Sequence, residues 1–100
     1  MITYEKVMEE FKEYLEMDED LEVVKLKHGY YLFIWDEVRK EYFFDTEVIR
    51  TDGQLIDALI DEMETFYKIR YGSNVNTKII DKKQAEFEKF MKKIKKKYGR

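Results

Sequence analysis

The sequence predicts an α+β fold in which one helix, three strands and two helices follow one another, an α-β-β-β-α-α order. Apolar residues recur at helical spacing near both ends of the chain, and apolar and polar residues alternate in three short segments between them. We therefore expect a three-stranded antiparallel sheet packed by helices. With 100 residues, of which 44% are hydrophobic and 16% aromatic, the chain is large enough for one core, so we expect residues 1–100 to form a single domain.

Three helices are predicted from stripes of apolar residues and from capping residues. The first covers about residues 4–17, and Thr3 is its expected N-cap. The second begins at Thr51, where Gln54 completes a capping box, and residues 72–74 (Gly-Ser-Asn) end it. The third is a lysine-rich amphipathic helix at about 82–98, with Asp81 and Gln84 as a second capping box.

The strand candidates are residues 21–27, 30–36 and 41–49. A two-residue turn, His28-Gly29, suits a tight hairpin between the first two strands. The four-residue loop that follows the second strand would place Trp35 opposite Tyr42.

Alternation of side chains divides the predicted sheet into two faces. In the same register Phe33 lies opposite Phe44, and both belong to the more apolar face. We expect the helices to cover this face, with Trp35 and Phe44 buried. Its members are Val24, Leu26, Tyr31, Phe33, Trp35, Tyr42, Phe44 and Val48.

Several classes of function lack support in the composition. The chain has no cysteine, which excludes disulfides and thiolate chemistry and makes the cytoplasm the expected location. Its longest apolar run, residues 30–35, is far shorter than the ~20 residues of a membrane span, and we see no signal peptide. The single histidine, His28, has no visible catalytic or metal-binding partner. We therefore expect no enzyme activity, no metal and no cofactor.

Charge is divided unevenly along the chain. Residues 1–77 carry 9 basic and 19 acidic side chains, a net charge of −10, whereas residues 78–100 carry 10 basic and 3 acidic side chains, a net charge of +7. The leading hypothesis is a protein-binding module whose acidic surface meets a basic, nucleic-acid-binding protein. The acidic residues expected to contribute are Glu9, Glu13, Glu16, Asp18, Glu19, Asp20, Asp57, Asp61 and Glu64.

Two other surfaces are candidates for binding. The third helix could bind nucleic-acid phosphates instead of packing its apolar side on the domain, which makes nucleic acid the alternative partner. Its lysines are Lys89, Lys92, Lys93, Lys96 and Lys97. The second face of the sheet holds Val23, Ile34 and Phe43, which would form an apolar interface if no helix covers them, and the third helix is the competing cover. A homodimer is a further candidate assembly.

The order of elements resembles two kinds of known protein. The α-β-β-β-α part resembles double-stranded RNA-binding domains, but residues 52–57 (DGQLID) lack the lysine cluster with which those domains grip phosphates. The full order, in a small acidic chain, is similar to that of some phage anti-CRISPR inhibitors, without a shared motif. The second resemblance implies an inhibitor or regulator encoded by a phage or mobile element.

Overall fold

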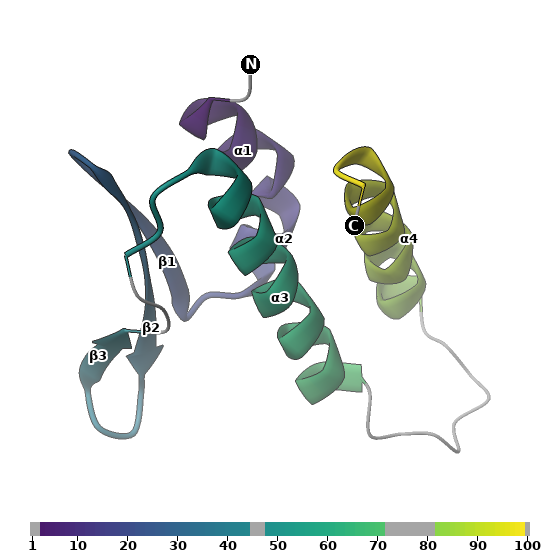
Figure 1. Ribbon diagram of the computed structural model, residues 1–100. Helices are drawn as coiled ribbons and strands as arrows, with labels where there is room; N and C mark the ends of the chain where they lie inside the picture. The colour runs from purple at the N-terminus through teal and green to yellow at the C-terminus, as the bar shows by residue number, and fades with distance from the viewer. Residues whose placement is uncertain (1–2, 45–47, 72–81, 100) are drawn as a thin grey trace. The chain divides into compact units, whose positions relative to one another are not determined.

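The computed structural model describes residues 3–44, 48–71 and 82–99, the side chain of Phe44 excepted. These residues contain four helices and one three-stranded antiparallel sheet, which confirms the α+β prediction and the order of the elements (Figure 1). Residues 1–58 form one compact unit and residues 59–100 form another, with helix α3 running from the first into the second. That the whole chain is a single domain stays a prediction.

The first predicted helix is divided in two. Helix α1 covers Tyr4–Glu10 and α2 covers Lys12–Met17, and Phe11 between them has φ −94° and ψ 6°. The Thr3 side chain accepts a hydrogen bond from the Lys6 amide at 3.2 Å, so the predicted N-cap is confirmed. Both helices contribute to the core, because Val7, Phe11 and Tyr14 are fully buried.

The sheet has the order β1-β2-β3, with β1 at Leu21–Leu26, β2 at Gly29–Asp36 and β3 at Glu41–Phe44. Trp35 pairs with Tyr42, as predicted. The first hairpin differs from the prediction, because Leu26 pairs with Gly29 and the turn is Lys27-His28. The register between β1 and β2 is therefore displaced by two residues. A displacement by an even number leaves every side chain on its predicted face.

Gly29 is a strand residue because another part of the chain passes close to it. Tyr30 and Ile49 exchange backbone hydrogen bonds of 2.8 and 2.9 Å, which brings the segment after β3 alongside the start of β2. A Cβ atom at Gly29 would collide with the Ile49 carbonyl oxygen and would lie 3.0 Å from Cγ1 of Val48. Glycine is thus required here by close packing of the backbone and not by the turn.

The predicted core face of the sheet is wrong. Within residues 1–58 the helices lie on the face that carries Tyr30 and Leu32 (Figure 1). The Tyr4 ring of α1 stacks on the Tyr30 ring at 5.5 Å, and the Tyr30 hydroxyl donates to Asp52 at the start of α3 at 2.5 Å. Leu32 on this face is fully buried, whereas Trp35 on the opposite face is only half-buried. The prediction for Phe44 lies outside the described side chains.

The second unit is a pair of helices. Helix α3 covers Asp52–Tyr71, and α4 covers Lys82–Lys97. Within residues 59–100 they run antiparallel, since Tyr67 of α3 stacks on Phe87 of α4 at 5.7 Å and Glu64 pairs with Lys95 at 2.8 Å. The apolar side of α4, with Phe87 and Ile94 buried, thus serves the core.

The start of α3 follows the predicted cap. The Gln54 amide donates to the Thr51 hydroxyl oxygen at 3.1 Å, and the Gln54 side chain accepts from the Arg50 amide, one residue before the position expected of a capping box. The predicted stop at residues 72–74 and the cap at Asp81 lie outside the described residues.

Candidate functional site

The strongest candidate site is the face of the sheet opposite the helices of residues 1–58, which we call the open face. Its central side chains come from β2, where Tyr31, Phe33 and Trp35 are half-buried. On the flanking strands, Tyr42 is 52% exposed and Val24 is 38% exposed. Solvent-exposed aromatic side chains in one patch mark binding surfaces, because monomeric proteins rarely leave such an area uncovered. The described side chains of the open face are Glu22, Val24, Leu26, Tyr31, Phe33, Trp35 and Tyr42.

The aromatic rings of the open face touch one another across the strands. The Tyr42 ring lies edge-on to the Trp35 ring at 4.8 Å and to the Phe33 ring at 6.2 Å. The Phe33 ring also contacts the Tyr31 ring at 5.8 Å. Edge-to-face contacts at these distances stabilise aromatic pairs and restrict the rings. The open face is thus a continuous aromatic surface held by its own contacts.

Two adjoining depressions, each of about 300 Å³, indent the open face. One is lined by Glu19, Glu22, Trp35 and Tyr42, and we call it the Trp35–Tyr42 pocket. The other is lined by Glu22 and Tyr42 together with Val24 and Phe33. The two share Glu22 and Tyr42, so they form a single shallow groove that is acidic at one end and apolar at the other.

Glu22 and Glu19 give the groove its charge. Hydrogen bonding to the nearby Glu22 carboxylate raises the pKa of Tyr42, with burial as a smaller cause. Because β1 and β3 each pair with β2, this bond spans the central strand. No described lysine or arginine forms an ion pair with Glu19 or Glu22.

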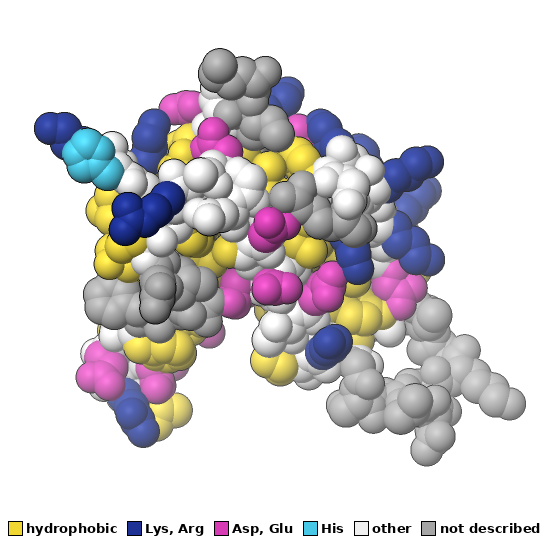
Figure 2. Space-filling view, in the orientation of Figure 1, with side chains coloured by type: hydrophobic (Ala, Val, Ile, Leu, Met, Phe, Trp, Pro, Cys, Tyr) yellow, Lys and Arg dark blue, Asp and Glu magenta, His cyan; other side chains and the backbone are white. Residues whose placement is uncertain are grey.

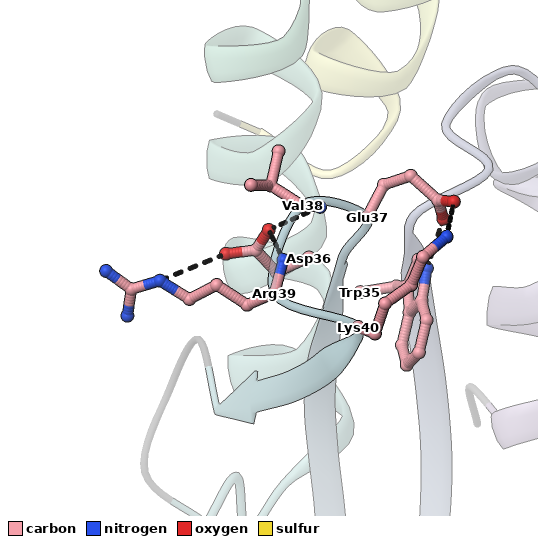
Figure 3. Close-up of polar contacts among 6 residues, drawn as sticks. All are labelled: Trp35, Asp36, Glu37, Val38, Arg39 and Lys40. Atoms are coloured by element: carbon pink, nitrogen blue, oxygen red, sulfur yellow. Dashed lines mark hydrogen bonds and ion pairs between the residues drawn. The ribbon is translucent and has the colours of Figure 1, made fainter.

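The turn after β2 borders the site and holds Trp35 in place (Figure 3). The Asp36 carboxylate accepts hydrogen bonds from the amides of Val38 and Arg39 at 3.0 and 3.1 Å, which organises the turn. The Glu37 carboxylate accepts from the Lys40 ammonium and from the Trp35 indole N–H, the latter at 2.6 Å. These two bonds lower the pKa of Glu37, the Lys40 bond more strongly.

The predicted acidic residues are spread over the chain, and the structure gives several of them partners. Asp18 accepts a hydrogen bond from Tyr14 at 2.7 Å, Glu9 lies 4.0 Å from the Lys6 ammonium, and Glu64 pairs with Lys95. Glu19 alone among them lines the groove. Of the remaining members, the exposed ones are Glu13, Glu16, Asp20, Asp57 and Asp61. Their role in binding stays a prediction.

The other two predicted surfaces can also be placed. Lysine and arginine side chains gather over α4 in Figure 2, and all five predicted phosphate-binding lysines are exposed. Val23 and Ile34 are half-buried and Phe43 is 47% exposed, and all three lie on the helix-side face. These positions do not test whether the lysines bind nucleic acid, or whether Val23, Ile34 and Phe43 form an interface.

Sequence reasoning missed Glu22, Trp35 and Tyr42 as surface residues. A signal was present in β1, because Glu22 lies two residues before Val24 and four before Leu26. Residues at this spacing in a strand share one face. A core on that face would have enclosed a carboxylate without a basic partner, which is costly. Lys25, on the helix-side face, argued equally against a core on that side. Its ammonium, however, reaches the edge of the sheet, where it lies 5.3 Å from the Tyr4 ring and 4.0 Å from Glu5.

The described residues show no other chemical centre. Within residues 3–44, 48–71 and 82–99, no group of three His, Asp or Glu side chains is arranged to hold a metal ion. His28 is exposed in the Lys27-His28 turn. None of the helices in this part of the chain is long and apolar enough to cross a membrane. The sequence matches no protein-family model, and comparisons with curated proteins and with solved structures gave no match.

Proposed function

We propose that this protein is a non-enzymatic, cytoplasmic protein-binding module that uses the open face to bind a basic protein. The observation that carries the proposal is a partly exposed aromatic surface bordered by two carboxylates, Glu19 and Glu22, that form no ion pair with a described lysine or arginine. Aromatic side chains supply much of the binding energy in protein interfaces, because they bury a large area with few rotatable bonds. The carboxylates add a preference for a positively charged surface.

A basic partner fits the charge of the chain as well as that of the groove. The net charge of −10 over residues 1–77 would attract a basic protein from a distance and repel nucleic acid. A partner that itself binds DNA or RNA presents such a basic surface. By occupying it, the module would compete with nucleic acid. The more specific proposal is an inhibitor or regulator encoded by a phage or mobile element.

Capture followed by reconstitution tests the proposal. The immobilised protein retains binders from a lysate, and each is identified, purified and titrated against wild type and the Phe33→Ser variant. We expect Phe33→Ser to weaken binding about tenfold or more, since truncation of a hot-spot aromatic costs about 2 kcal/mol or more. Ile69→Ser is the matched control, because Ile69 is an apolar residue that is 79% exposed on α3. Equal affinity of Phe33→Ser and wild type for every purified binder would contradict the proposal.

The exposed lysines of α4 support the alternative function, binding to nucleic acid. This alternative predicts that wild type shifts duplex DNA or RNA in a mobility assay, with an affinity that falls steeply as salt rises. Our proposal predicts no such shift. A salt-sensitive shift that disappears when Lys92, Lys93, Lys96 and Lys97 are changed to glutamine would favour the alternative.

A further inference from the structure

The Trp35–Tyr42 pocket combines two kinds of group that both attract cations. The Trp35 and Tyr42 rings meet edge-on at 4.8 Å, and the face of an aromatic ring is electronegative. Glu19 and Glu22 line the same depression of about 300 Å³. A cation placed there would interact with ring faces and carboxylates together.

The two aromatic side chains of the pocket are held in place before any ligand binds. The Trp35 indole N–H donates to Glu37 at 2.6 Å, and the Trp35 backbone amide donates to the Asp20 carbonyl oxygen at 2.9 Å. The Tyr42 ring lies edge-on to the Trp35 ring at 4.8 Å and to the Phe33 ring at 6.2 Å, so its orientation is also restricted. Side chains fixed in advance lose little conformational entropy on binding.

The chemistry of these four residues favours guanidinium over ammonium. A guanidinium group is planar, stacks on aromatic rings and donates parallel hydrogen bonds to carboxylates, whereas an ammonium is compact and strongly hydrated. Carboxylate–guanidinium bonds are also among the strongest in proteins. The neighbouring apolar depression, with Val24 and Phe33, suits an apolar residue beside the cation.

On the basis of the proposed function, we infer that the Trp35–Tyr42 pocket receives an arginine side chain of the protein partner. The guanidinium lies against the two rings and donates hydrogen bonds to Glu19 and Glu22, and an adjacent apolar side chain of the partner enters the depression at Val24 and Phe33. Arginine is abundant where proteins meet DNA or RNA, so this pocket would occupy a residue that the partner uses for nucleic acid.

Trp35 is the single tryptophan of the chain, so it reports directly on the pocket. The full-length protein is titrated with three short peptides that are identical except for a central arginine, lysine or citrulline, each flanked by leucine. The indole N–H resonance and the intrinsic fluorescence are followed. We expect the arginine peptide to bind at least about tenfold more tightly than the citrulline peptide, which is isosteric and uncharged, and more tightly than the lysine peptide.

Substitutions of the two pocket carboxylates test whether the arginine peptide binds at this pocket. Glu22→Gln and Glu19→Gln should each weaken the arginine peptide about fivefold or more, because each removes one charged acceptor while keeping its size. Glu86→Gln, at an exposed acid on α4 outside the predicted acidic surface, is the matched control and should leave the affinity unchanged. Preservation of the amide NMR spectrum away from the substituted residue shows that each variant is folded.

The outcomes separate this inference from the proposed function. Equal binding of arginine and citrulline peptides, or an unchanged Trp35 resonance, overturns the arginine pocket. Tighter binding of the lysine peptide overturns the choice of guanidinium. If a purified partner loses affinity for Phe33→Ser but not for Glu19→Gln or Glu22→Gln, the pocket is wrong and the proposed function stands. If Phe33→Ser binds every partner like wild type, the proposed function fails, whatever the peptides do.

Discussion

The two faces of the sheet are built from the same three strands but serve different purposes. On the helix-side face Leu32 is fully buried and Leu21 and Ile49 are each 6% exposed, and the Tyr30 side chain links α1 to the start of α3. The open face has more aromatic side chains, yet none of its members is in the buried core.

The difference shows that apolar character alone does not identify the core face of a sheet. On the helix-side face Leu21 and Leu32 are enclosed, and the Tyr30 ring stacks on the Tyr4 ring of α1. Large rings on the open face contact one another and bracket Glu22, which a dry core would not accommodate. Apolar residues that stabilise the fold and those that bind a partner can therefore alternate along a single strand.

The largest expected effect is on the free energy of unfolding, when a leucine from the helix-side face is truncated and compared with one from the open face. Leu32→Ala should lower the free energy of unfolding by about 2–5 kcal/mol, because it leaves a cavity in the core. Leu26→Ala removes the same atoms from a residue that is 38% exposed on the open face, and should cost less than about 1.5 kcal/mol. Urea denaturation of both variants measures the contrast, and equal losses would show that the assignment of the faces is wrong.

The next effect concerns the close approach of the Ile49 segment to β2. Gly29→Ala should destabilise the protein by about 1–3 kcal/mol, since the added methyl group collides with backbone that cannot move independently of the sheet. Gly53→Ala is the control, because a Cβ there meets only the Thr51 hydroxyl oxygen at 4.0 Å. Thermal unfolding should show a lower midpoint for Gly29→Ala alone. A Gly29→Ala protein as stable as wild type would mean that Ile49 does not pack there.

A smaller effect is expected at the contact between β2 and α3. Tyr30→Phe should cost about 1 kcal/mol, because Asp52 loses the hydroxyl that donates to it at 2.5 Å. The bond to Asp52, followed by burial, raises the pKa of Tyr30 to about 12. The folded state therefore holds this proton more tightly than the unfolded chain, whose tyrosines titrate near 10.

The sign of the pH dependence follows from that raised pKa. The stabilisation is complete below pH 10 and is lost as the pH rises from 10 towards 12. Over this interval wild type should lose more stability than Tyr30→Phe in urea titrations at each pH. Parallel losses in the two proteins would rule out this role for the bond.

The smallest effect is expected for a polar change on the open face. Val24→Thr should alter the free energy of unfolding by less than about 0.5 kcal/mol, because the side chain is already 38% exposed. The same change should weaken partner binding if the apolar depression is used. A large loss of stability, measured alongside Leu26→Ala, would indicate that the open face is part of the core.

Local features were predictable from the sequence because they depend on neighbouring residues. The Thr3 cap, the start of α3 at Thr51 and the pairing of Trp35 with Tyr42 were all predicted, since each is set by a spacing of a few residues. The register of the first hairpin was not. Leu26 pairs with Gly29 because Gly29 is needed beside Ile49, a contact between residues twenty positions apart.

The candidate site likewise combines features that the sequence determines with features that only the packing of distant segments determines. The sequence by itself determined the α+β order, the alternation that puts Glu22, Val24 and Phe33 on one face, and the separation of charge along the chain. The tertiary structure alone decided which face the helices cover and that Glu19 joins Glu22, Trp35 and Tyr42 in one pocket. The physical reason is that alternation fixes which side chains share a face, whereas burial depends on how distant segments pack, and both faces of this sheet are apolar enough to receive a helix.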